Sequence, residues 1–181
     1  NAEFSKGRRP AVNIPLSVTR VGRQTQSELG RDTNQNLTKL VTQFEDMSNM
    51  AHFGAELSGK VKTTLAMGDK MYEVFQQPHY TNIPECVQLI MIALVWSGIV
   101  PVDQIHDLKM KLIDALSTKK NGTYLDSLIE GNTLYELQTR VLKEKDTLFK
   151  TIGFEINVAQ VQKEKQEQSG GLQSGAEGSG S

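Results

Sequence analysis

The chain has 181 residues, of which 38% are hydrophobic and 23% charged, with a formal net charge of −1 and a single cysteine. This apolar content suits one core of ordinary size, so we expect one domain. A near-neutral charge argues against nucleic acid or an anionic membrane as the main partner, and one cysteine rules out an internal disulfide.

Positive charge gathers at the start of the chain. Residues 1–31 carry six basic and two acidic side chains, a local net charge of +4. Residues 8–22 contain two prolines and several β-branched residues without a helical period, which predicts extended chain or loop. An anionic ligand or partner would therefore be expected to bind to this first segment.

Two helices are predicted next. Apolar side chains at three- and four-residue steps give the first helix an apolar stripe about four turns long. The second helix, over residues 61–75, contains Gly68 as a weak point. The stripe of the first helix consists of Leu37, Leu40, Val41, Phe44, Met47, Met50 and Ala51.

Pro84 and Glu85 suit the first turn of a third helix, because proline needs no amide partner there and an acidic side chain meets the positive end of the dipole. The apolar run from Cys86 to Val100 is shorter than the roughly 20 residues that cross a bilayer. It predicts a helix buried inside a bundle. The side chains expected in this interior are Cys86, Val87, Ile90, Leu94 and Trp96.

Three further helices are predicted toward the C-terminus. The inward face of the fourth helix is predicted to consist of Ile105, Leu108, Leu112, Ile113 and Leu116. Asn121-Gly122 predicts a turn before a short helix, and Thr133 has capping-box spacing to Glu136 at the start of a last helix that runs to Ile152. From about Gln162 the Lys/Glu/Gln and then Gly/Ser composition predicts no packed core, so the end is either a native flexible tail or a fusion remnant.

Two site types are rejected on spacing. Gly54 to Val61 has the glycine and lysine spacing of a phosphate-binding loop, but Val61 stands where the loop needs a hydroxyl for magnesium. We interpret this run as a helix-to-helix connection. The three histidines lack paired-ligand spacing and Cys86 has no cysteine partner nearby, so the sequence supports no metal site and no nucleophile beside a histidine base.

The arginines of the first segment sit on non-helical chain. Guanidinium groups offer a planar fork suited to phosphate oxygens and stay charged when desolvated. By themselves they indicate a basic loop, either solvated or anion-binding. Two runs here resemble the segment that closes the nucleotide-binding domain of F-type ATPase α subunits. The runs are Phe4-x-x-Gly7-x-Arg9-Pro10-Ala11-Val12-Asn13 and Leu16-Ser17-Val18-Thr19-Arg20-Val21-Gly22.

The resemblance continues downstream in the family's order, through Phe44 to Gly54, Gly68 to Gln77, and Gln88 to Ile92 with Pro101, and it covers roughly residues 3–156. It implies a role for each matching residue. Arg20 matches the arginine finger that α presents to the catalytic site of an adjacent β subunit, with Ser17 close to that site. The residues implied at the adenine end of α's own non-catalytic nucleotide site are Phe4, Arg9, Pro10, Gln77 and His79.

Two positions depart from the family pattern. His79 stands where the family usually has a second Gln, and Pro78 where Gly is common. An adenine contact at these two positions would therefore differ from the one usual in the family. Arg23-Gln-Thr-Gln26 replaces the small residues usual after the glycine. The sequence therefore leaves open whether the protein is an ordinary synthase subunit or a specialised relative.

The resemblance also implies a fold and partners. The fold would be mostly α, with residues 1–26 as the end of a nucleotide-binding domain, 27–156 as a helical bundle and 157–181 as a flexible tail. The bundle would surround the central γ-type stalk, in a ring in which this subunit alternates with β-type subunits. ATP or ADP with Mg²⁺ would be bound by the assembled complex and not by this chain alone.

The implied location is peripheral, on the cytoplasmic face of a bacterial membrane or the matrix face of a mitochondrial one, without membrane insertion and without nucleic acid. The alternative is an independent helical interaction or scaffold domain whose basic leader binds an anionic partner such as nucleic acid. Salt-sensitive association with nucleic acid would favour that alternative.

Overall fold

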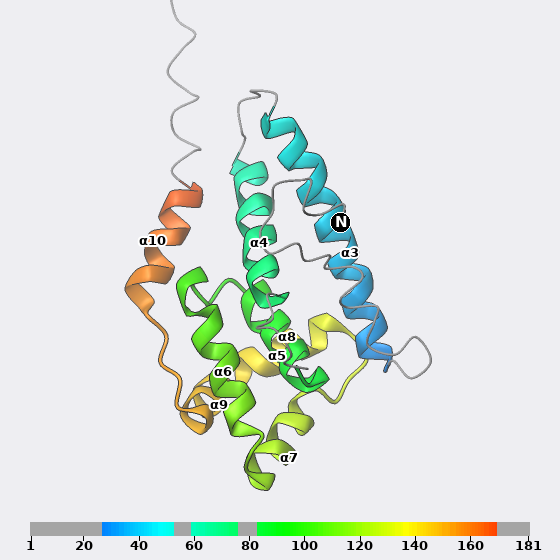
Figure 1. The fold of residues 1–181 in the computed structure, drawn as a ribbon, viewed down its shortest axis with the longest axis vertical. Coiled ribbons are helices and arrows are strands. Elements are labelled where there is room, and N and C mark those ends of the chain that lie inside the picture. Colours follow the sequence, from blue (N-terminus) through cyan, green and yellow to red (C-terminus); the bar gives the residue numbers. More distant parts are fainter. Residues whose placement is uncertain (1–26, 53–58, 76–82, 170–181) are drawn as a thin grey trace, which may run out of the picture.

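The computed structural model describes residues 27–52, 59–75 and 83–169, which form a helical bundle with no β-strand among them (Figure 1). This confirms the predicted mostly α fold. The elements are α3 (Glu28–His52), α4 (Gly59–Phe75), α5 (Glu85–Trp96), the short 3-10 helix η1 (Val102–Gln104), α6 (Ile105–Ala115), α7 (Lys119–Leu128), α8 (Leu134–Lys143), α9 (Lys145–Ile152) and α10 (Val158–Ser169).

Helix α5 forms the centre of the bundle, where it contacts α4, α6, α7 and α8. Val87, Ile90 and Leu94 are fully buried, as predicted, because a helix that is apolar nearly all round, with Gln88 the one polar side chain after its first residue, has no wide polar face to turn to water. Trp96 was predicted in the interior, but it is only partly buried. It lies at the last position of α5, just before Gly98 turns the backbone away with φ of +70°.

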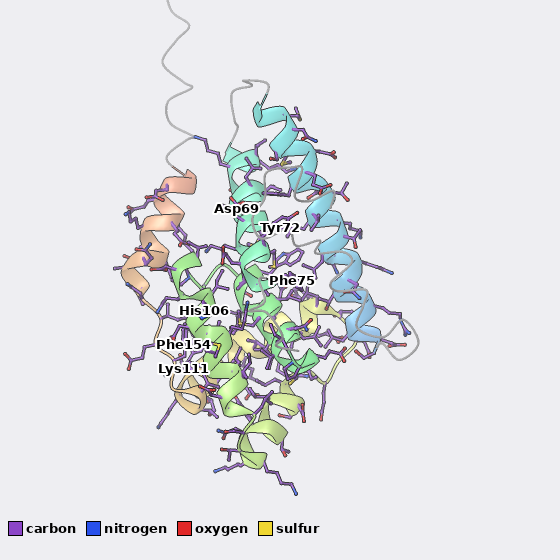
Figure 2. All side chains as sticks on the ribbon, viewed as in Figure 1. Asp69, Tyr72, Phe75, His106, Lys111 and Phe154 are labelled. Carbon is purple, nitrogen blue, oxygen red and sulfur yellow. The ribbon has the colours of Figure 1, made fainter. Side chains whose placement is uncertain are left out.

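Helices α3 and α4 run antiparallel along one side of the bundle (Figure 1). The predicted stripe of α3 is buried at Leu37 and Phe44, but Met50 near its end is 60% exposed. Gly68 proves to be a packing requirement: a Cβ there would overlap the ring of Phe44. Tyr72 on α4 points toward α3, with its ring centroid 5.5 Å from that of Phe44 (Figure 2). Glycine therefore lets the two helices approach closely.

Two predictions about the C-terminal half were wrong. Asn121 and Gly122 lie in the first turn of α7, where the Gly122 amide donates to the Thr118 carbonyl at 2.9 Å. Helix formation from Thr118 overrode the turn preference of the Asn-Gly pair. The predicted last helix is divided into α8 and α9 at Glu144, whose φ of −100° and ψ of 8° leave the helical region.

The predicted cap at the start of α8 is confirmed and has a second support. Thr133 Oγ1 accepts the Glu136 amide at 3.2 Å, and Glu136 Oε2 accepts the amide of Asn132 at 2.9 Å. Asp32 of α3 adds its Oδ2 as acceptor for the Leu134 amide at 2.7 Å. The free donors at this helix start are thus shared between a local cap and a distant helix.

Regular structure extends beyond the predicted end of the fold. No packed structure was expected from about Gln162, yet α10 runs to Ser169 and contacts α4 (Figure 1). The apolar content of α10 is low, so its position depends on polar contacts with the bundle. Those contacts are described below.

Candidate functional site

The site residues indicated by the sequence lie outside the described residues. They are Phe4, Arg9, Pro10, Ser17 and Arg20 in residues 1–26, and Gln77 and His79 in residues 76–82. Their roles stay predictions. The structure describes the helix ends to which these two segments connect.

The first segment joins the bundle at the start of α3. Ser27 Oγ caps this helix by accepting the Gly30 amide at 3.1 Å. Leu29 and Thr33 are each 1% exposed, so the first two turns are packed into the bundle. The bond from Asp32 to the Leu134 amide also attaches this end of α3 to α8. The segment that carries Arg20 therefore ends on a firmly held helix.

The second segment joins α4 to α5, and both of its ends are held. Phe75, the last residue of α4, is buried, and Lys109 Nζ of α6 donates to the Glu73 carbonyl at 3.1 Å. Burial lowers the pKa of Lys109, against the opposing effect of the Glu73 charge. On the far side Ile83 is buried, and Gln88 Nε2 donates to its carbonyl at 2.8 Å.

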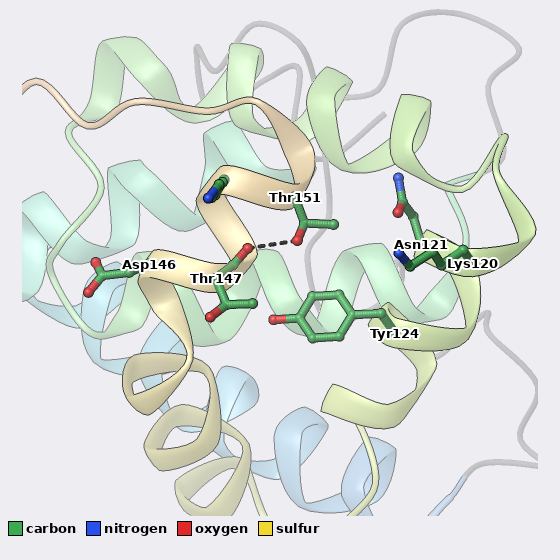
Figure 3. Close-up of a pocket in the computed structure, with 7 residues that line it drawn as sticks. Lys120, Asn121, Tyr124, Asp146, Thr147 and Thr151 are labelled. Carbon is green, nitrogen blue, oxygen red and sulfur yellow. Dashed lines mark hydrogen bonds between the residues drawn. The ribbon is translucent and has the colours of Figure 1, made fainter.

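A groove of about 740 Å³ lies between α7 and α9 (Figure 3). Tyr124 lies within it and donates its hydroxyl to Glu144 Oε2 at 3.3 Å. Burial, with the Glu144 charge, raises the pKa of Tyr124 to about 12, which makes the phenol a hydrogen-bond donor and a poor general base. The lining residues are Lys120, Asn121, Tyr124, Asp146, Thr147, Lys150 and Thr151. Its charged side chains are exposed, and none is held in a catalytic pair by a contact described here.

One charged cluster joins residues that are far apart in the sequence. Lys70 Nζ on α4 lies 2.6 Å from Glu164 Oε2 on α10 and donates to the Val100 carbonyl at 2.8 Å. Glu164 Oε1 accepts the Val102 amide at 2.9 Å. Lys70 is 7% exposed, so a nearby counter-charge is needed to offset the loss of its hydration. Sequence reasoning missed this cluster because a lysine in a helix usually reads as solvated and no spacing links it to α10.

Other chemistry finds little support in the part of the chain that the structure describes. No group of three or more His, Cys, Asp or Glu side chains there is placed to hold a metal ion. Cys86 is buried as predicted, and burial raises the pKa of its thiol, which makes it a packing group and a poor nucleophile. Over the same residues, no helix has the length and apolar character to span a membrane.

Comparison with known proteins gives a consistent set of relatives. The family model described as the ATP synthase alpha/beta chain, C terminal domain, matches residues 26–148. ATP synthase subunit alpha of Rhodococcus opacus is 30% identical over 150 residues, 81% of this chain and 27% of the relative. The subunit alpha of Streptomyces griseus is 31% identical over 137 residues, 72% of this chain and 25% of the relative.

A third relative, ATP synthase subunit alpha 1 of Mycoplasmopsis pulmonis, is 26% identical over 144 residues, 78% of this chain and 27% of the relative. The chain thus spans about a quarter of the length of the curated relatives that it matches. The family match ends at residue 148, before the end of α9 and before all of α10.

Proposed function

The protein belongs to the family formed by the C-terminal domains of ATP synthase alpha and beta subunits and corresponds to the C-terminal region of an F-type α subunit, and we propose that it contributes Arg20 to the catalytic site of a neighbouring β-type subunit. The observation that carries this proposal is the run Leu16 to Gly22, directly upstream of the matched domain. The reaction would be phosphoryl transfer between ATP and water.

In this proposal Arg20 neutralises charge that develops on the γ-phosphate in the transition state. The neighbouring subunit supplies the phosphate-binding loop, the magnesium ion and the carboxylate that orients water. Ser17 would lie close to the same site. The helix that follows this segment, α3, has its start capped by Ser27 and bonded to α8 through Asp32.

A second, non-catalytic nucleotide site is proposed at the end of the upstream nucleotide-binding domain. Phe4, Arg9, Pro10, Gln77 and His79 would line its adenine end. On either side of residues 76–82, Lys109 of α6 binds the Glu73 carbonyl and Gln88 binds the Ile83 carbonyl. The helical bundle would surround the γ-type stalk, and the complex would be peripheral to the membrane.

Assembly tests the proposal directly. The subunit that contains this chain, expressed with a β-type partner and a γ-type stalk, is expected to form an alternating ring that hydrolyses ATP. The readouts are size-exclusion chromatography with light scattering, and steady-state hydrolysis. Failure to associate, together with salt-sensitive binding of nucleic acid by the basic leader, would support an independent interaction domain in its place.

The isolated 181-residue chain is expected to bind MgATP weakly and not to hydrolyse it. Phe4, Arg9 and Gln77 would contact only the base, and the phosphates, which usually dominate nucleotide affinity, would have no cradle. Titration calorimetry on the isolated chain checks this. A dissociation constant in the micromolar range or tighter would show that the chain holds a phosphate site of its own.

A further inference from the structure

Helix α10 has little apolar surface with which to hold its place. Of its two valines, Val158 is 61% exposed, and most of its other described positions are polar and exposed. A 12-residue helix of this composition is marginal in water when it stands alone. Glu164 is the α10 side chain that reaches the buried Lys70, and this ion pair therefore contributes to the docking of the helix.

The site that binds the Glu164 carboxylate belongs to the bundle and not to α10. Lys70 is oriented by the Val100 carbonyl, and the Val102 amide is presented at the start of η1. These two donors take one carboxylate oxygen each, at 2.6 Å and 2.9 Å. A two-pronged contact with an ionised group is stronger and more directional than a single neutral hydrogen bond.

The segment that leads into α10 is held separately. The side-chain amide of Gln104 binds the backbone of this segment twice. Its Nε2 donates to the Glu155 carbonyl at 3.0 Å, and its Oε1 accepts the Asn157 amide at 2.8 Å. Ile156 packs against the core between these two bonds. Attachment by Gln104 therefore stops at Asn157, one residue before α10 begins.

We propose that α10 is a releasable strap, closed by Glu164 in the site formed by Lys70 and Val102, and hinged at Asn157, whose amide is bound by Gln104 while its carbonyl accepts the Val161 amide of α10. Release of the carboxylate frees α10 as a unit, while Gln104 keeps residues 155–157 in place and α3 to α9 stay folded. The open state places a lysine and a backbone amide at the vacated surface. The strap lies beyond the family match at residue 148, and its release is separate from the proposed function.

Glu164→Gln is the decisive variant, because it keeps the length of the side chain and removes its charge. We expect amide hydrogen exchange across residues 158–169 to become about tenfold faster or more. Trypsin is expected to cut faster after the exposed Lys163 and Lys165. The Asn157 amide, bound to Gln104, and the amides of α5 should exchange as before. The matched control is Glu167→Gln, the same change of charge at an exposed position of α10.

Val102→Pro tests the second prong without touching α10. It removes the backbone donor, and Pro101 already has φ of −71° and ψ of 153°, a conformation that a residue before proline adopts readily. This variant should also release α10. In the double variant, the fold increase in amide exchange should be smaller than the product of the two single-variant increases, because both changes break the same contact. Equal exchange in Glu164→Gln and Glu167→Gln overturns the proposal. So does faster exchange of the α5 amides in Glu164→Gln, since α10 would then be part of the core.

Discussion

Arg20→Ala in the assembled ring is expected to lower ATP turnover by about 10³–10⁵-fold, or roughly 4–7 kcal/mol of transition-state stabilisation. An arginine finger meets charge that develops only as the γ-phosphate is transferred, so ground-state nucleotide affinity should change far less. Steady-state hydrolysis and nucleotide affinity, both measured on purified rings, separate the two effects.

Arg20→Lys is the matched control for charge. Lysine keeps the positive charge but loses the planar fork that binds two phosphate oxygens, so this variant should recover only part of the rate. If Arg20→Ala rings assemble and hydrolyse ATP within about threefold of the unmodified ring, a difference of under about 1 kcal/mol, then Arg20 is structural or solvated. The proposed role in catalysis would then be wrong.

Gly68→Ala is expected to destabilise the protein by about 2–3 kcal/mol, although alanine is the better helix former. The new Cβ would overlap the aromatic ring of Phe44, and overpacking of this kind typically costs about 1–3 kcal/mol and sometimes more. Urea denaturation should show a lower midpoint with an unchanged m-value. That combination would mean that the native packing has changed and the denatured state has not.

Gly122→Ala is the control for helix propensity. Gly122 is also helical, and the nearest atom to its added Cβ, Leu116 Cδ2, lies at an ordinary 4.0 Å. This variant should stabilise the protein by about 0.5–1 kcal/mol.

Adding Phe44→Leu to Gly68→Ala should recover part of the lost stability, a coupling that distant residues do not show. If Gly68→Ala proves as stable as Gly122→Ala, then α3 shifts without cost.

Periodicity and caps predicted the bundle because they depend on neighbours in the sequence. The mostly apolar run of α5 predicted a helix buried inside a bundle, and the spacing of Thr133 and Glu136 predicted the start of α8. The same reasoning failed at Asn121-Gly122, where a helix started by the preceding residues outweighed the turn preference of the pair. It also placed Trp96 too deep, since composition does not show where the last turn of a helix meets the surface.

Long-range polar contacts could not be predicted. Lys70 and Glu164 meet only because α4 and α10 pack side by side, and neither residue has a local pattern that marks it. Gly68 was predicted as a weak point because its helix propensity is low, whereas its partner Phe44 belongs to another helix. The candidate site itself was indicated by the resemblance and not by spacing. Its residues lie outside the described part of the sequence, so only the helix ends that flank them can be compared.

The bond between Asp32 and the Leu134 amide joins residues 102 positions apart. A ribosome that adds about 5–20 residues per second needs roughly 5–20 s to bring the second partner out after the first. A local partner for Asp32 lies one turn along α3, where Asn36 Nδ2 donates to the same carboxylate oxygen at 3.2 Å, and this contact needs no residue outside α3. The nascent helix can therefore hold the acceptor in position until α8 emerges to use it.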